Sequence, residues 1–274
     1  MQGMPAAASR VRSEAGGSPS RVSRSQVLRP DLVIEKQREI PVASYADVRF
    51  ALGSDLEVSP RERDEDVSRG LNIAIALIAL VVLSPVMLLI AVAINLTSRG
   101  PVLYSQTRVG VDRRWRFARN SERRLYDYGG KLFTMYKFRT MHVNAEADGR
   151  AVWASKSDPR VTLVGRFLRT ARLDEIPQLW NVLRGHMNIV GPRPERPAIV
   201  AELRRQIPEY QQRQRVKPGI TGWAQVNQSY DACIDDVRQK VQFDLEYVRR
   251  QSMLEDLRIM SMTVPVILFR KGGW

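Results

Sequence analysis

The chain has 274 residues, of which 43 are Lys or Arg and 29 are Asp or Glu, so its formal net charge is +14. Such a surplus predicts a polyanionic partner, which is nucleic acid, an anionic membrane surface or a phosphorylated substrate. The single cysteine, Cys233, excludes an internal disulfide framework. Neither histidine, His142 or His186, lies in a recognisable Cys–His catalytic motif.

The N-terminal region is poor in apolar residues. Residues 1–40 are rich in Ser, Arg, Pro, Gly and Ala and predict a disordered basic tail, because they bury too little apolar surface to offset the entropy of ordering. No apolar stretch follows their early arginines, so a signal peptide is not expected. Residues 41–68 are expected to hold a short helix around Tyr45–Leu52 and then a charged linker.

The apolar run Leu71–Leu96 is the strongest physical signal, because as a helix it is long enough to cross a bilayer. Ser84 and Pro85 stand at its midpoint, where proline removes a helix hydrogen bond. Arginines flank both ends, and positive charge favours the cytoplasmic side. Two topologies fit. Residues 69–98 form either a re-entrant helix broken at Ser84-Pro85, which enters and leaves on one side, or a spanning helix with a kink.

Residues 99–274 are expected to form one cytoplasmic domain. Val102–Thr107 and Lys131–Phe138 predict a small β-hairpin, interrupted by a basic, aromatic insert at residues 112–128. Helical spacing dominates the remainder. The predicted fold class is therefore α+β, mainly α, with a membrane helix–break–helix attached to this domain.

Two C-terminal helices follow from periodicity and capping. One apolar stripe at helical spacing consists of Val237, Val241, Leu245 and Val248. Ser252 and Glu255 form a capping-box pattern that opens the last helix. That helix is amphipathic, and it lies either flat in the membrane interface or against the core.

Asp174 and Glu175 are adjacent acids just before Pro177, a residue suited to the first turn of a helix that runs through Leu183. A helix N-terminus also favours a phosphate. Two anions and a phosphate need countercharge, from a divalent metal or from arginines. The candidate arginines are Arg169, Arg172 and Arg193. Acids at this position more commonly cap the helix, so the residues alone leave both roles open.

Six stretches between residues 69 and 270 carry recognisable motifs. They are the Ser84-Pro85 apolar segment, GPVLYSQTRVG at 100–110, YKFRTM at 136–141, RLDEIPQLWNVLRG at 172–185, VGPRPE at 190–195 and VKPGITGWAQVN at 216–227. Their order resembles the bacterial sugar transferase family, the monotopic polyprenyl-phosphate sugar-1-phosphate transferases (phosphoglycosyl transferases). One departure is Asn72, where an aspartate is common.

The resemblance implies an enzyme that transfers a sugar-1-phosphate from a nucleotide diphospho-sugar, usually a UDP-sugar, to polyprenyl (undecaprenyl) phosphate and releases UMP. It implies that Asp174 forms a covalent phosphosugar intermediate and that Glu175 helps hold Mg²⁺, or Mn²⁺ in its place. Matching motifs make further basic residues the substrate-phosphate contacts. These are Lys137, Arg139, Arg169, Arg193 and Lys217. Each of them, taken alone, is more often a solvated surface charge.

The resemblance also implies a place at the bacterial inner membrane, with the active site on the cytoplasmic face. There the enzyme would catalyse the first membrane step of exopolysaccharide, O-antigen, capsule or glycoprotein glycan synthesis. It implies no nucleic-acid partner and leaves the sugar and a homo-oligomer open. Two alternatives remain: a membrane-tethered protein that binds nucleic acid through the basic insert, and a non-catalytic subunit of a polysaccharide assembly system. Neither gives Asp174 and Glu175 a role.

Overall fold

The computed structural model describes residues 57–114, 127–143, 145, 158–228 and 234–268. The predicted tail, the predicted helix Tyr45–Leu52, the middle of the predicted insert and Cys233 lie outside these ranges. Within them the chain is mainly helical, with one small antiparallel sheet and one long apolar helix. The predicted class, α+β and mainly α, is confirmed.

The elements follow one another along the chain in a mixed order. The strands are β1 (Leu103–Val109), β2 (Leu132–Phe138), β3 (Asn188–Val190) and β4 (Gly219–Thr221). The α-helices are α3 (Glu65–Thr97), α4 (Leu163–Thr170), α5 (Gln178–Leu183), α6 (Pro197–Gln206), α7 (Trp223–Asn227), α8 (Ile234–Arg250) and α9 (Met253–Leu268). The 3₁₀ helices are η3 (Leu173–Glu175) and η4 (Pro208–Arg215).

The two sheets each have two strands. β1 and β2 form the predicted antiparallel hairpin, with Tyr104 opposite Lys137. β3 and β4 form a parallel pair that the sequence did not predict, because each strand has only three residues. This pair brings the GPRP and KPG segments together so closely that a Cβ atom on Gly219 would lie 2.1 Å from the backbone nitrogen of Gly191. Only glycine fits there.

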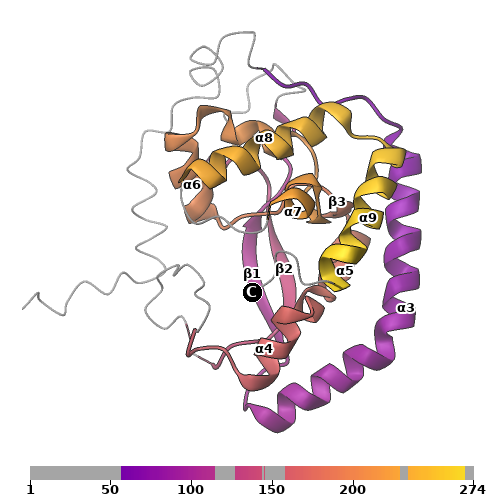
Figure 1. The fold of residues 1–274 in the computed structure, drawn as a ribbon, viewed down its shortest axis with the longest axis vertical. Coiled ribbons are helices and arrows are strands. Elements are labelled where there is room, and N and C mark those ends of the chain that lie inside the picture. The colour runs from indigo at the N-terminus through magenta and orange to yellow at the C-terminus, as the bar shows by residue number, and fades with distance from the viewer. Residues whose placement is uncertain (1–56, 115–126, 144, 146–157, 229–233, 269–274) are drawn as a thin grey trace, which may run out of the picture.

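The long helix α3 is continuous through Pro85 and bends along its length, as Figure 1 shows. Proline at position 85 has no N–H to donate to the carbonyl of Val81, its partner in a regular helix. The hydroxyl of Ser84 donates to that carbonyl instead, at 2.8 Å. The segment predicted to break at Ser84-Pro85 is therefore a bent helix whose freed carbonyl has a local donor.

Both ends of α3 are bonded to the same domain. Near its start, Arg69 donates to the carbonyls of Val182 and Leu183 at the end of α5, at 2.5 and 2.6 Å. Just beyond its end, Arg139 donates to the carbonyls of Ser98 and Arg99, at 2.6 and 2.7 Å. Each arginine thus bonds to backbone carbonyls at or just beyond the C-terminal end of a helix, where basic side chains commonly lie.

Asn72 adds a third bond between α3 and the domain. Its side-chain oxygen accepts from the backbone N–H of Ile189 in β3 at 2.6 Å, and its amide donates to the carbonyl of Ser68. The side chain is buried. This departure from the family pattern therefore has a defined structural role.

Apolar packing holds α3 along both halves of the bend. Before Pro85, Ala76 packs in a cluster with Phe133 and Met135 of the hairpin and with residues of α5. After Pro85, Ile90 and Ile94 pack with Phe138 and Leu168. Because both halves contact the hairpin and the helices beside it, α3 wraps around the part of the domain that carries the acid pair (Figure 1).

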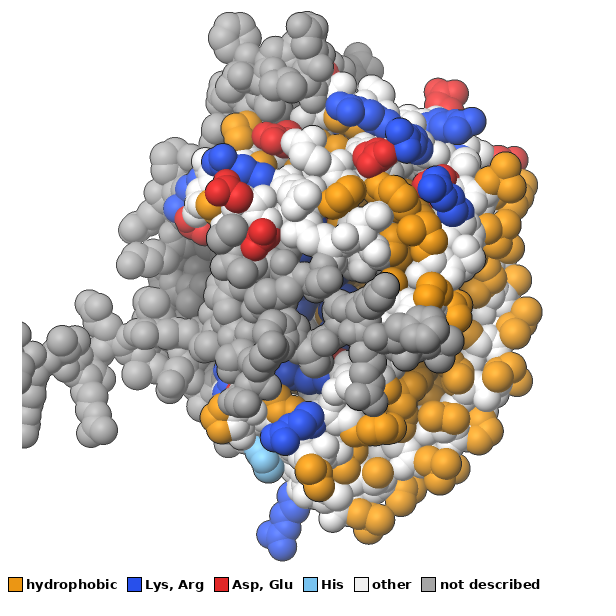
Figure 2. Space-filling model, in the orientation of Figure 1, with side chains coloured by type: hydrophobic (Ala, Val, Ile, Leu, Met, Phe, Trp, Pro, Cys, Tyr) orange, Lys and Arg blue, Asp and Glu red, His pale blue; other side chains and the backbone are white. Residues whose placement is uncertain are grey.

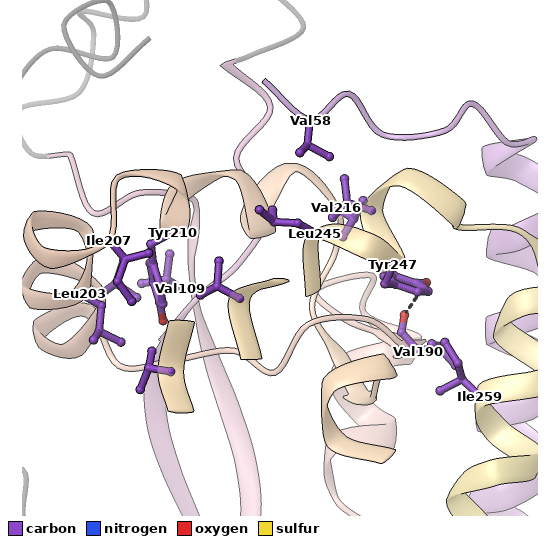
Figure 3. Close-up of a cluster of buried hydrophobic side chains, with 14 residues drawn as sticks. Val58, Val109, Val190, Leu203, Ile207, Tyr210, Val216, Leu245, Tyr247 and Ile259 are labelled. Atoms are coloured by element: carbon purple, nitrogen blue, oxygen red, sulfur yellow. Dashed lines mark hydrogen bonds between the residues drawn. The ribbon is translucent and has the colours of Figure 1, made fainter. Parts of the chain in front are cut away.

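The largest core lies away from α3, among α6, η4, α8, α9 and the strand ends, as Figure 3 shows. The four residues of the predicted α8 stripe are buried there, so that prediction is confirmed. Tyr247 lies beside Val190 and Ile259 in this cluster, and its hydroxyl donates to Asp256 at 2.7 Å and lies 3.3 Å from the carbonyl of Val190. Ser252 accepts from the N–H of Glu255 at 3.1 Å, as the capping pattern predicted.

Asn181 connects α5 to the hairpin and was not identified from the sequence. Its amide donates to the carbonyl of Thr134 at 2.6 Å, and its side-chain oxygen accepts from the N–H of Tyr136 at 3.1 Å. The side chain is fully buried. Because α5 follows the acid pair and β2 carries Lys137, this amide holds the acid pair and Lys137 at a fixed separation.

We predict that Asn181→Ala lowers the free energy of unfolding by about 2 kcal/mol or more, because the substitution leaves two buried backbone groups without partners. Chemical denaturation of the purified protein in detergent measures the loss. Asn227→Ala is the matched control, since its exposed side chain bonds only to Trp223 within α7, and it should change stability by less than about 0.5 kcal/mol. Equal effects of the two substitutions would contradict the role of Asn181.

Candidate active site

The acid pair lies in η3, a single turn between α4 and α5. Arg172, immediately before it, has a φ of 55° and is the one non-glycine residue with a left-handed backbone in the described ranges. Such a conformation is unfavourable for an arginine and is typical of functional turns. It redirects the chain so that Asp174 and Glu175 are both buried, within 9% exposure.

Glu175 is the acceptor for two cations from distant segments. Lys137 of β2 donates to its Oε1 at 2.9 Å, and Arg193 donates to Oε1 at 2.5 Å and to Oε2 at 3.2 Å. Burial raises the pKa of Glu175, but the charges of Arg193 and Lys137 outweigh burial and hold the pKa well below its ordinary value. Glu175 is therefore an anion with its charge neutralised.

Asp174 differs from its neighbour. Among the described residues, no group donates a hydrogen bond to its carboxylate. Burial raises its pKa; the charge of Lys137 opposes this shift, and the charge of Glu175 adds to it. The geometry thus gives the two acids different states: Glu175 is held by cations, and Asp174 has a carboxylate without a donor.

The other predicted contacts divide into two groups. Arg169 donates from Nε to the hydroxyl of Thr140 at 2.9 Å and lies near enough to Asp174 to lower the pKa of that acid. Together with Lys137 and Arg193, it belongs to the site. Burial lowers the pKa of Lys137, and Glu175 opposes that shift.

Arg139 and Lys217 lie elsewhere. The two terminal amino groups of Arg139 bond to the carbonyls after α3 and its side chain is buried, so its position is that of a helix cap. Lys217 lies among other cations near the start of α3: burial lowers its pKa, and Arg69 and Arg113 lower it further. Among the described residues, neither Arg139 nor Lys217 has a hydrogen bond or an ion pair with Asp174 or Glu175.

Trp223 belongs to the core. It packs against the largest apolar cluster, and its indole N–H donates to Glu246 at 2.8 Å. Arg258 lies over its ring, with 5.3 Å from the guanidinium carbon to the ring centre. Its contacts connect α7 to α8 and α9 and leave no sign of a stacking role.

The donor set of the site is compatible with Mg²⁺. In the described part of the chain, no three acids or histidines gather as a complete protein cage. Mg²⁺ commonly takes one or two carboxylates, with substrate phosphates and water completing its shell. Asp174 has an uncommitted carboxylate, and Oε2 of Glu175 accepts only the 3.2 Å bond from Arg193. Two adjacent carboxylates fit this pattern.

Residues 64–270 match the family model described as bacterial sugar transferase. The chain belongs to the bacterial sugar transferase family. The matched region contains all of α3, the hairpin, the acid pair and the C-terminal helices. The family resemblance of the motifs is therefore confirmed.

Several curated relatives share this region. The chain is 42% identical over 207 residues to the UDP-N-acetylgalactosamine-undecaprenyl-phosphate N-acetylgalactosaminephosphotransferase of Aeromonas hydrophila, which covers 76% of this chain and 45% of the relative. It is also 42% identical over 200 residues to the UDP-glucose:undecaprenyl-phosphate glucose-1-phosphate transferase of Escherichia coli (strain K12). That match covers 72% of this chain and 39% of the relative. A transferase of the same name from Caulobacter vibrioides is 38% identical over 211 residues. That match covers 76% of this chain and 72% of the relative.

The chain thus spans less than half the length of the first two of these relatives. Their printed names also differ in the sugar, which is N-acetylgalactosamine in one and glucose in the other. The shared part of the family is the region with α3 and the acid pair.

We predict that substitutions of the two neighbouring acids change stability in opposite directions. Asp174→Asn should raise the thermal unfolding midpoint at neutral pH, because a carboxyl whose pKa is raised in the folded state destabilises that state once ionised. Glu175→Gln should lower the free energy of unfolding by about 3 kcal/mol, because it leaves Lys137 and Arg193 with no counter-ion.

Differential scanning fluorimetry of the two variants in detergent, in the absence of substrate, measures both effects. The two substitutions are of the same chemical kind and serve as controls for each other. The direction of the change in unfolding midpoint for Asp174→Asn has a further check. The stabilisation by Asn should shrink as the pH falls and the native Asp174 takes up its proton. A lower midpoint for both variants would contradict the assignment of their charge states.

Proposed function

We propose that this protein transfers a sugar-1-phosphate from a UDP-sugar to undecaprenyl phosphate, with Asp174 as the nucleophile. The observation that carries the proposal is the asymmetry of the acid pair: both oxygens of Glu175 are bonded to cations, and Asp174 has no donor among the described residues. A carboxylate without hydrogen-bond donors keeps its nucleophilic lone pairs accessible. The names of the relatives support the substrate class.

In the first half of the reaction, an oxygen of Asp174 attacks the phosphorus atom that carries the sugar. The bond from that phosphorus to the bridging oxygen breaks, and UMP leaves with this oxygen. The product is an aspartyl phosphosugar. Arg169, Arg193 and Lys137 lie around the acids, where cations stabilise negative charge on the transferring phosphoryl group.

In the second half, a phosphate oxygen of undecaprenyl phosphate attacks the same phosphorus atom, and the bond to Asp174 breaks. The free carboxylate is regenerated, and the lipid leaves with a diphosphate linked to the sugar. One transfer to the carboxylate and one from it replace a single direct reaction between two anionic substrates. Bound Mg²⁺ would supply charge stabilisation of the diphosphate, and Glu175 with Asp174 would hold it.

We further propose that α3 is re-entrant, with both ends on the cytoplasmic side of the inner membrane. By length and composition α3 is able to cross a membrane. A crossing helix separates its ends by about 30 Å of hydrocarbon, yet Arg69 and Arg139 bond both ends of α3 to one domain. The bend and the packing of both halves on that domain support the same topology.

The outward surface of this domain fits the proposal. Hydrophobic side chains gather along the edge formed by α3 in Figure 2, including Leu88, Leu89 and Leu96. Leu163 and Phe167 of α4 are also exposed, at 81% and 64%. Leu254, Leu257 and Val264 of α9 face outward as well, which favours the interfacial interpretation of the last helix. Exposed apolar side chains gathered on neighbouring helices are typical of a membrane contact.

The test of the nucleophile is Asp174→Asn. Wild-type protein in detergent, given Mg²⁺, undecaprenyl phosphate and a panel of UDP-sugars, should release UMP from at least one of them, and the variant should release none above background. Asn caps helices as well as Asp does, so a capping role for Asp174 requires an active variant. Asp235→Asn, at an exposed acid of α8, is the control and should remain fully active. Neither a nucleic-acid-binding protein nor a non-catalytic subunit would release UMP.

The test of topology places single cysteines at Glu62 and Arg99, on either side of α3, in a Cys233→Ser background. Both side chains are exposed, so both cysteines should react with a thiol reagent once the membrane is lysed. In intact spheroplasts we expect a membrane-impermeant reagent to label neither. Labelling of the Glu62 position alone would establish a spanning helix and contradict the re-entrant form.

A further inference from the structure

Arg193 reaches Glu175 from the segment Pro192–Glu195, which we call the Arg193 loop. Each backbone carbonyl of this loop has its own donor from another part of the domain. Gly219 N–H donates to Pro192, Arg213 Nη2 to Arg193, Arg108 Nη1 to Pro194 and Val109 N–H to Glu195, each at 3.0 Å. The backbone that carries Arg193 is therefore held at every residue.

Arg213 is the more deeply buried of the two arginines among these donors, with a side chain 3% exposed against 15% for Arg108. Besides the Arg193 carbonyl, its guanidinium bonds to one oxygen of Asp244, through Nε at 2.8 Å and Nη2 at 2.6 Å. Its Nη1 donates to the hydroxyl of Tyr210 at 3.0 Å. Asp244, in α8, is 1% exposed. The planar fork of an arginine is needed to serve three acceptors at once.

Stability alone does not account for this pair. Removing two charges from water costs free energy that their mutual attraction only partly offsets, and apolar residues of similar volume often serve a core as well or better. Apolar residues, however, have no donor for the carbonyl of Arg193. The feature that distinguishes Arg213 and Asp244 from a packed apolar pair is that bond to the Arg193 loop.

We propose that Arg213 and Asp244 are positioning residues, which act on phosphoryl transfer through Arg193. Asp244 orients the guanidinium of Arg213, Arg213 holds the carbonyl of Arg193, and the side chain of Arg193 holds both oxygens of Glu175. The proposal rests on the proposed function, since it assigns a task to Arg193 at the acid pair. Neither Arg213 nor Asp244 touches substrate in this scheme.

A double-mutant cycle with Asp244→Asn and Arg193→Ala tests the proposal. In the wild-type background, Asp244→Asn should lower kcat for UMP release on the order of tenfold to a hundredfold, the range that small misplacements of a catalytic group produce, with a smaller change in KM. In the Arg193→Ala background, the same substitution should change kcat by less than about twofold, because no guanidinium remains to be misplaced. Equal factors in the two backgrounds would overturn the proposal.

Asp112→Asn is the matched control. Asp112 is a buried carboxylate, 3% exposed, and it pairs with Arg114 and with Gln211 of η4 but has no bond to the Arg193 loop. The Asp112→Asn substitution should lower the unfolding midpoint and leave kcat within about twofold of wild type, because the contacts of Asp112 lie outside the Arg193 loop. A loss of kcat as large as that of Asp244→Asn would make the effect a general one of buried charge and would overturn the proposal.

Two further measurements keep the result decisive. The double-mutant cycle is repeated on the thermal unfolding midpoint, without substrate. The changes in midpoint should be non-additive for Asp244→Asn with Arg193→Ala and additive for Asp112→Asn with Arg193→Ala. This measurement decides whether Asp244 and Arg193 are coupled even if the wild-type protein releases no UMP. The absence of UMP release would refute only the proposed function. If Asp244→Asn does not fold, Arg213→Lys replaces it: the charge pair remains, but the carbonyl of Arg193 loses its donor, and the same loss of kcat is expected.

Discussion

Two cations from distant parts of the chain meet at the carboxylate of Glu175, and the arrangement of the site follows from this contact. Lys137 comes from the hairpin and Arg193 from the segment after β3. Neither of these segments can move away from Glu175 without separating charges that are largely shielded from water. Glu175 satisfies both cations, and its neighbour Asp174 has no donor within the part of the chain that the structure describes. The chemical difference between two adjacent acids therefore depends on which of them receives the cations.

Much of the architecture could be predicted from the sequence, because it depends on local patterns. The hairpin, the helix after Pro177 and the buried stripe of α8 follow from periodicity and capping, and all three are present. The place of Asp174 and Glu175 before a helix left a capping role and a catalytic role open, and only the resemblance to the family favoured the catalytic one. What periodicity could not distinguish was the role of each acid, since that depends on Lys137 and Arg193, which are 38 and 18 residues from Glu175 along the chain.

Other features lie beyond any local pattern. β3 and β4 are too short for an alternating signal, and their pairing depends on the close approach of Gly191 and Gly219. A basic residue in a motif looks the same whether it meets a substrate phosphate or a helix carbonyl. For Arg139 the structure shows contacts with the carbonyls after α3. Asn181 and Arg213 carried no signal either, because both bond to backbone groups of segments that are distant along the chain.

The packing of α3 has a consequence for where the chemistry takes place. Leu173 and Ile176, the residues on either side of the acid pair, pack in the same apolar cluster as Ile90 and Ile94 of α3. The residues beside the acids are thus packed directly against the helix that we propose enters the lipid. In a bilayer, the depth to which that helix sinks fixes the height of the acids above the headgroups. Leaflet thickness then becomes a variable of the reaction, alongside substrate concentration.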